Sequence, residues 1–354
     1  MSTDVNSAGD VSNYSITRST RSTHVGLGLA AVAVVALLSV PLWGSTDTMR
    51  LAIDIFLYVA LAAMWNFLAG YAGLMSIGQQ AYVGLGGYLF FALTAKAGLS
   101  PWVSVPLVGL AAAVLSVPIA ALLFRLRGAY FAIGSWVMAE VFHLGSSLIT
   151  PLGGGSGMSL PVNVAKAVAS GSHERYVAVY CMTMALLFGI LLLIVLVLRS
   201  RWGLALTAIR DNELAARSNG IDVGRSKLVV YVVTAFGTAM IGALIFLQRL
   251  RISPDAAFSV NDWTALVIFM VVIGGLGSFE GPIIGALVYF CLRETLADLG
   301  AYYLMILGAV AIVTMLWAPQ GLWGLARSRW HVQLLPLRLQ VNRRPGPEVP
   351  PRGR

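Results

Sequence analysis

Charged side chains are scarce in this sequence. Asp, Glu, Lys and Arg make up 11% of its 354 residues, whereas a soluble domain carries about 25%. The mean hydropathy is +0.81, so apolar side chains dominate the chain. This combination excludes an ordinary soluble domain and indicates a protein that lies in a membrane.

Cysteine and histidine are also rare, with two and four copies. Cys181 and Cys291 both lie inside apolar runs, so we expect buried, unreactive thiols. Their spacing fits neither a zinc site nor a redox motif, and no metal site is expected. The sequence likewise lacks the histidine clusters, nucleophile constellations and paired carboxylates that would indicate an enzyme.

Long continuous apolar runs are what the sequence has in abundance. A helix needs about 20 apolar residues to cross a bilayer, and a membrane barrel would instead show alternating strands of about ten residues. The runs therefore predict an all-α integral membrane protein, a polytopic bundle of about ten transmembrane helices. Gly281-Pro282 is either a turn between two spans or a break within one. The expected spans are 25–43, 51–69, 81–97, 102–124, 130–149, 176–198, 228–248, 263–280, 282–298 and 302–318.

The chain divides into three parts. Residues 1–24 are polar and predict a disordered tail, residues 25–326 form the transmembrane domain, and residues 327–354 form a basic tail with seven arginines. That tail suits contact with anionic membrane lipid.

The basic residues predict the orientation. The net charge of +9 comes mainly from Lys and Arg beside apolar runs, which argues against nucleic-acid binding. Seventeen of the 24 basic residues fall on one side if the span number is even. Basic segments favour the cytoplasm, so both termini are expected there. Arg249 and Arg251 are exceptions that this count does not explain.

Residues 199–227 form the longest polar interruption on that side, with six basic and three acidic residues. Leu204, Ala208, Leu214 and Ala215 can share one helical stripe, which predicts a short amphipathic helix ending at Asn219-Gly220. Such a helix could dock a cytoplasmic partner or lie on the membrane surface. The residues alone leave both readings open.

Part of this segment resembles a known family. Glu213, Ala215, Ala216 and Gly220 resemble the Glu-Ala-Ala-x-x-x-Gly loop of bacterial ABC importer permeases, with Leu214 as an extra residue. Further segments resemble the branched-chain amino-acid permease family of the LivM type in the same order. They are 125–133, 153–158, 200–228, 252–256 and 271–288.

The resemblance implies a permease subunit of an ABC importer in the bacterial inner membrane. It would carry branched-chain or other small amino acids, or related solutes such as urea, amides or aromatic acids. Its partners would be ATPase subunits that bind the ATP, a second related permease and an extracytoplasmic solute-binding protein. The chain itself would need no cofactor. Glu213, Ala215, Ala216 and Gly220 would form the coupling helix, with the small residues facing the ATPase.

Polar residues inside spans are candidates for the solute pathway because burying them is costly. They are Asn66, Gln79, Gln80, Glu140, His143 and Asn261. Gly274 and Gly275 could line a gate, because a break at membrane depth is tolerated where it packs in protein or lines a cavity. Close helix packing explains these glycines equally well.

Glu140 and His143 support an alternative function. Their i, i+3 spacing places them on one helix face, where a structural hydrogen bond is the simpler explanation. An ion-coupled secondary transporter would use such a titratable pair. It would leave the basic 199–227 segment without a role.

Overall fold

The computed structural model describes residues 14–17, 21–169, 171–296, 302–318, 320–330 and 340–343. Two compact units are distinguished, 1–38 with 330–354 and 39–329. In the first, β1 (Tyr14–Thr17) pairs antiparallel with β4 (Gln340–Arg343). Helix α1 (Arg21–Trp43) begins inside the segment expected to be a tail. The rest of the two expected tails, apart from β4 and the end of α15, lies outside the described residues.

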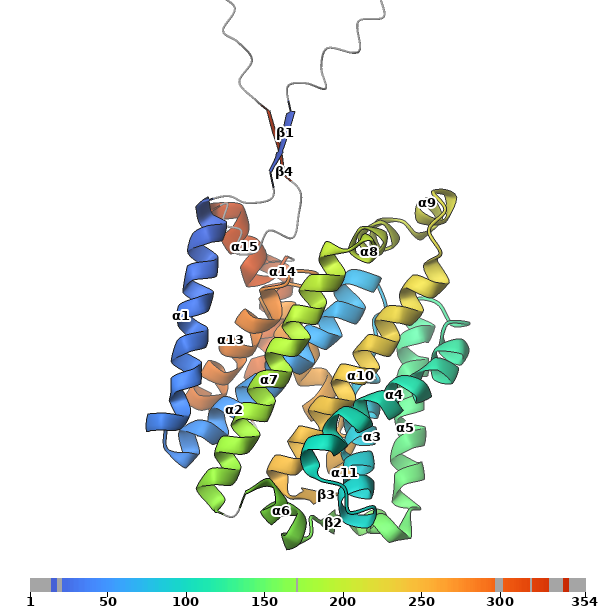
Figure 1. The fold of residues 1–354 in the computed structure, drawn as a ribbon. Helices are drawn as coiled ribbons and strands as arrows, with labels where there is room; N and C mark the ends of the chain where they lie inside the picture. Colours follow the sequence, from blue (N-terminus) through green and yellow to red (C-terminus); the bar gives the residue numbers. More distant parts are fainter. Residues whose placement is uncertain are drawn as a thin grey trace, which may run out of the picture. The chain divides into compact units, whose positions relative to one another are not determined.

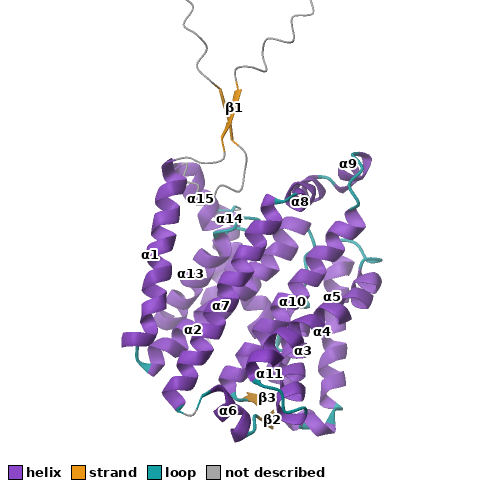
Figure 2. Ribbon diagram, in the orientation of Figure 1, coloured by secondary structure: helices purple, strands orange, loops and turns teal. Residues whose placement is uncertain are grey.

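The second unit is a bundle of helices (Figures 1 and 2). Three helices continue into or begin from π-helical turns, which often mark functional positions. The elements in chain order are α2 (Thr46–Asn66), η2 (Phe67–Tyr71), α3 (Gln79–Phe91), η3 (Ala92–Lys96), α4 (Pro101–Leu123), α5 (Ala129–Ser147), η4 (Thr150–Leu152), η5 (Gly154–Ser156), β2 (Met158–Ser159), α6 (Val162–Val168), α7 (Ser172–Arg199), α8 (Arg201–Asp211), α9 (Glu213–Ser218), α10 (Val223–Arg249), β3 (Arg251–Ile252), α11 (Pro254–Ala257), η6 (Asn261–Ala265), α12 (Leu266–Gly274), α13 (Gly281–Leu296), α14 (Tyr302–Trp317) and α15 (Gly321–Trp330).

The architecture confirms an all-α membrane protein. Among the described residues, six helices are long and apolar enough to cross a membrane, or seven if α5 is counted with the bent segment after it. All ten expected ranges contain a helix, but α13 covers only 16 residues, fewer than the usual span. The structure therefore supports six or seven spans by length and composition.

Two helices form the centre of the bundle. In α2 with η2, 78% of the most apolar window is buried, and in α10 the share is 67%, against 33% in α4 and 28% in α7. Small residues let α3 and α10 approach closely. A Cβ at Gly86 would lie 2.8 Å from the Ala239 Cα, and one at Gly242 would lie 2.9 Å from the Val83 Cα. Helices α4 and α7 lie at the periphery, and much of each remains exposed on the single chain.

The expectation of buried cysteines is wrong. Cys181 on α7 and Cys291 on α13 are both exposed on the surface of the single chain. An apolar run indicates that a segment lies in the membrane, but all faces of such a helix are apolar. The run therefore does not tell which face turns inward.

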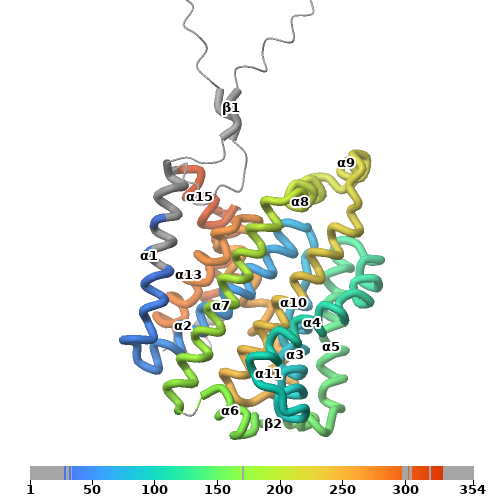
Figure 3. Tube along the Cα trace, in the orientation of Figure 1, coloured from blue at the N-terminus to red at the C-terminus, as the bar shows by residue number. Residues whose placement is uncertain are grey.

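The connections gather at two opposite ends of the bundle. Helices α8 and α9 cap one end, whereas α6, α11, β2 and β3 lie at the other (Figures 1 and 3). At that second end β2 pairs antiparallel with β3, with Met158 opposite Ile252. The Leu160 amide also donates to the Leu250 carbonyl at 2.8 Å. The glycine-rich loop after α5 is thus held against the end of α10.

Candidate functional site

The polar segment 199–227 contains two helices instead of one. Helix α8 ends at Asp211, and Asn212 caps α9 by accepting a hydrogen bond from the Ala215 amide at 3.0 Å. Asparagine is a favoured N-cap because its side chain satisfies an amide that lacks a helical partner. Gly220 has φ +78°, the left-handed geometry that ends a helix. The predicted stop at Asn219-Gly220 is confirmed.

The break at Asn212 changes which residues face inward. Ile209, Ala216 and Val223 form a small buried core, with Ala208 and Ile221 packed against it. Ala216 is 2% exposed, whereas Leu204 and Leu214 are 68% and 77% exposed. The expected stripe of Leu204, Ala208, Leu214 and Ala215 is therefore not the buried face. Ala216 supports the loop from within, and Leu214 and Ala215 lie on its outer surface.

Glu213 ties the loop to the bundle. Its carboxylate accepts from Lys227 Nζ at 2.7 Å and from Arg217 Nη2 at 2.8 Å. The hydrogen bond from Lys227 is the main reason why the pKa of Glu213 lies below its ordinary value, and the two positive charges add to it. Lys227 belongs to the first turns of α10, so Glu213 fixes the position of α9 relative to that helix.

Asn66 lies at the end of α2 and holds the glycine-rich break between α12 and α13. Its amide nitrogen donates to the Ser278 carbonyl at 2.7 Å, and its oxygen accepts from the Gly277 amide at 2.8 Å. Gly274 ends α12, and Gly275 has φ +128°. This backbone conformation would be strained for any residue with a side chain. The structure therefore joins Asn66 to the segment of Gly274 and Gly275, three residues predicted separately.

Gln79 and Gln80 begin α3 and are buried. Gln79 Nε2 donates to the Leu61 carbonyl at 3.2 Å and to Thr238 Oγ1 at 3.5 Å. Gln80 pairs with Thr264, whose hydroxyl donates to its side chain and accepts from its amide. These bonds link α3 with α2, α10 and η6. In this conformation both glutamines hold helices together, and a place in the pathway stays a prediction.

Glu140 and His143 are paired, as their spacing predicted. His143 Nδ1 lies 3.0 Å from Glu140 Oε1, and its Nε2 lies 3.1 Å from Asp255 Oδ1 on α11. The triad is at the end of α5 that meets α11, and the carboxylates are largely exposed. His143 therefore connects α5 with α11.

Arg249 packs on an aromatic ring. Its guanidinium lies 4.8 Å from the centre of the Trp263 ring, and a cation over an aromatic face is stabilised. Asp54, near the start of α2, lies within range of the positive charges of Arg293 and Arg249. The contact with the Trp263 ring therefore stabilises the side chain of Arg249 in this position.

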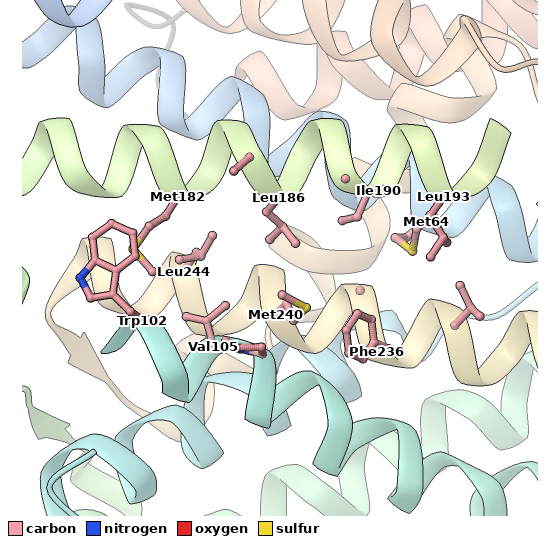
Figure 4. A pocket seen from close by; sticks show the side chains of 15 residues that line it. Met64, Trp102, Val105, Met182, Leu186, Ile190, Leu193, Phe236, Met240 and Leu244 are labelled. Atoms are coloured by element: carbon pink, nitrogen blue, oxygen red, sulfur yellow. The ribbon is translucent and has the colours of Figure 1, made fainter. Parts of the chain in front are cut away.

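An apolar cavity of about 450 Å³ lies between α2, α4, α7 and α10 (Figure 4). Its lining is almost entirely hydrophobic and includes none of the polar residues predicted for the pathway. Methionine, leucine, tryptophan and phenylalanine side chains surround it, among them Met64, Trp102, Met182, Leu186, Phe236 and Met240. The cavity and the polar candidates are therefore separate features.

Arg210 is a further residue of this site and was not predicted from the sequence. Its Nη1 donates to the Gly70 carbonyl at 3.3 Å, which connects α8 with the π-helical end of α2. The nearby amphipathic pattern could have identified Arg210 as a polar residue on α8. The partner, 140 residues earlier in the chain, could not be inferred.

Comparisons with known proteins agree on one family. The family described as the permease component of the branched-chain amino acid transport system matches residues 48–315. The high-affinity branched-chain amino acid transport system permease protein LivM of Escherichia coli is 29% identical over 86% of this chain and 76% of its own length. A probable LivM of Methanocaldococcus jannaschii is 24% identical over 75% of this chain and 90% of its own length. The ribose import permease RbsC of Bacillus subtilis is 32% identical over 40% of this chain and 45% of its own. No solved structure matches the chain.

Proposed function

The chain belongs to the family of branched-chain amino acid transport permeases, and we propose that it is the membrane-spanning subunit of an ABC importer in a bacterial inner membrane. The family match covers residues 48–315, which include the bundle and the α8–α9 segment. The proposed solutes are branched-chain or other small amino acids, with urea, amides and aromatic acids as related possibilities. The transport subunit itself catalyses no reaction, and ATP binds to the partner.

The outer surface of α9 is the proposed docking site for the ATPase. This helix projects from one end of the bundle (Figure 1), and Leu214 is 77% exposed there. An apolar side chain in such a position is suited to enter a cleft of a partner. Beneath it, Glu213, Ala216 and Gly220 fix the helix through ion pairs, packing and a left-handed turn.

The proposed orientation places α8, α9 and both termini in the cytoplasm. It assumes about ten membrane spans. Of the basic residues, 17 of 24 then lie on the cytoplasmic side, as positively charged loops favour. Arg249 lies on the other side, where its contact with Trp263 offsets the unfavourable placement. The end with α6, α11 and the β2–β3 pair would meet the solute-binding protein.

A second, related permease would complete the pathway. The most apolar windows of α4 and α7 are only 33% and 28% buried in the single chain. Their outward faces therefore have room for lipid and for a partner subunit. Asn66, Gln79, Gln80, Gly274 and Gly275 stay candidates for the pathway, because alternating access requires these helices to move between two arrangements.

Transport in proteoliposomes tests this function. The complex purified through this chain would be reconstituted with labelled leucine, urea, acetamide or benzoate, with and without ATP. We expect accumulation of one of these solutes only with hydrolysable ATP and the binding protein. Accumulation driven by an ion gradient without ATP would instead establish the secondary transporter, and Glu140→Gln and His143→Gln would then abolish it.

A further inference from the structure

Three segments that are far apart in the sequence meet at the cytoplasmic end of α2. They are the last two residues of α8, the π-helical turn η2, and the loop from Gly275 to Glu280 between α12 and α13. We call Asn66, Gly70, Arg210, Gly277 and Ser278 the glycine joint. All five lie within the compact unit 39–329.

Arg210 is the part of the joint that comes from α8. Its Nη1 donates to the Gly70 carbonyl at 3.3 Å. The same Nη1 would lie 2.9 Å from a Cβ at Gly277, so the guanidinium packs directly against that glycine. Asp211 lies 3.4 Å from Arg210 Nε and helps to orient the side chain from within α8.

Gly70 and Gly277 form the close contact beneath this arginine. A Cβ at Gly70 would lie 2.6 Å from the Gly277 nitrogen, so any side chain would push the two segments apart. Gly277 has φ +72°, a conformation that favours glycine. Asn66 then closes the joint with two hydrogen bonds, to the Ser278 carbonyl and from the Gly277 amide.

The arrangement gives α8 a direct connection to the break between two membrane helices. We propose that Arg210 is the positioning residue that transmits movement of the α8–α9 segment to the α12–α13 break, through the glycine joint. This inference rests on the proposed function, because the movement comes from an attached ATPase. The physical basis is that the charged guanidinium of Arg210 contacts both Gly70 and Gly277, which pack against each other.

The alternative is a purely structural role, in which Arg210 anchors α8. An anchor would affect the amount of folded protein or the attachment of the ATPase. A transmitting residue would affect the amount of solute moved per ATP hydrolysed, while ATPase attachment stays unchanged. The two roles are therefore separable by experiment.

The variants are Arg210→Gln and Arg210→Lys, with Arg201→Gln as the matched control. Arg201 lies at the start of the same helix and its side chain is exposed. The full complex is reconstituted with the solute that the wild-type complex accumulates from leucine, urea, acetamide and benzoate. Uptake per ATP hydrolysed is measured in each variant, together with the amount of ATPase that copurifies.

We expect Arg210→Gln to keep the ATPase but to lower uptake per ATP by about 5-fold or more, the range of a typical coupling free energy. Arg210→Lys should fall between Arg210→Gln and wild type, since a lysine keeps the charge without the fork of donors. Arg201→Gln should match wild type. Asn66→Ala should lower the ratio as well, and combining it with Arg210→Gln should add little, because both act on one joint.

Hydrogen exchange at the Gly277 and Ser278 amides provides a second readout. In the wild-type complex, ATP should change their protection, and in Arg210→Gln this ATP-dependent change should disappear. An unchanged ATP response and an unchanged uptake ratio in Arg210→Gln would overturn the inference, and so would loss of ATPase attachment alone. If the wild-type complex itself takes up solute without ATP, the proposed function fails instead.

Discussion

Single side chains in the α8–α9 segment have roles that their residue types alone do not reveal. Ala216 and Ala215 are neighbours of identical chemistry, yet the first lies in a small core with Ile209 and Val223 and the second is exposed. The sequence predicted both as contact residues, because the Glu-Ala-Ala pattern gives no direction. Asn212, an N-cap residue inside the predicted helix, was the signal that would have separated them.

Glu213 provides a prediction about pH. Its pKa lies below the ordinary 4.5 mainly because Lys227 donates to it. Because the pKa is lowered, the ion pairs stabilise α9 fully when the pH is above the ordinary pKa of Glu. This stabilisation is lost as the pH falls through the lower pKa of the folded state. In a background with Cys181→Ser and Cys291→Ser, a spin label at Ser218→Cys should therefore become more mobile as the pH falls below 4.5, the ordinary pKa of a glutamate side chain.

The matched variant for this measurement is Glu213→Gln. Its label should be mobile already at neutral pH and should show no further change on acidification. Because the Glu213 side chain is 42% exposed, the effect should remain local to α9. A label that is equally immobile in both proteins at neutral pH would show that the carboxylate does not hold this helix.

Whole elements were easier to predict than their partners. Each expected apolar range contains a helix, because hydrophobic length is a local property of the chain. The contact of Asn66 with Ser278 spans 212 residues, and no local pattern indicates it. For the same reason the sequence identified Gln79 and Gln80 as polar residues in spans, yet did not indicate their partners. Gln79 bonds to Leu61 and Thr238, and Gln80 bonds to Thr264.

The two faces of α9 should respond differently to the same new charge. Leu214→Arg places it on the exposed face, so the loop should stay folded while the ATPase no longer copurifies. Ala216→Arg forces it into the small core, where overpacking costs about 1–3 kcal/mol, and α9 should lose its protection from hydrogen exchange. Arg225→Gln, at an exposed position on α10, serves as the control.

Equal copurification of the ATPase with Leu214→Arg and with wild type would contradict docking through α9. Equal exchange protection of α9 in Ala216→Arg and wild type would contradict the small core. The two results are independent of each other, because one concerns a partner and the other concerns the chain alone.

At the scale of the whole molecule, the connecting segments gather at two opposite ends of the bundle. One carries the charged α8–α9 segment, and the other carries α6, α11 and the β2–β3 pair (Figure 1). Composition predicted the membrane class, because 11% charged residues is incompatible with an ordinary soluble domain. Burial on the single chain could not be predicted, as the exposed Cys181 and Cys291 show, since apolar faces in a membrane turn toward lipid as readily as toward protein.

Orientation follows from these two ends. In a background with Cys181→Ser and Cys291→Ser, we expect an impermeant maleimide added to spheroplasts to label Lys166→Cys and to miss Leu204→Cys. Both native side chains are exposed, so access depends on the side of the membrane. Labelling of Leu204→Cys from outside would contradict this orientation and would show that α8 and the adjoining α9 are not in the cytoplasm.

The central claim is that an ATPase covers the outer face of α9. The most direct measurement is the rate at which a maleimide labels Leu214→Cys, in the same cysteine-free background, in the purified permease with and without its ATPase. Arg225→Cys is the exposed control. We predict that the ATPase slows labelling of Leu214→Cys strongly and leaves Arg225→Cys unchanged. Equal labelling of Leu214→Cys with and without bound ATPase would contradict the account.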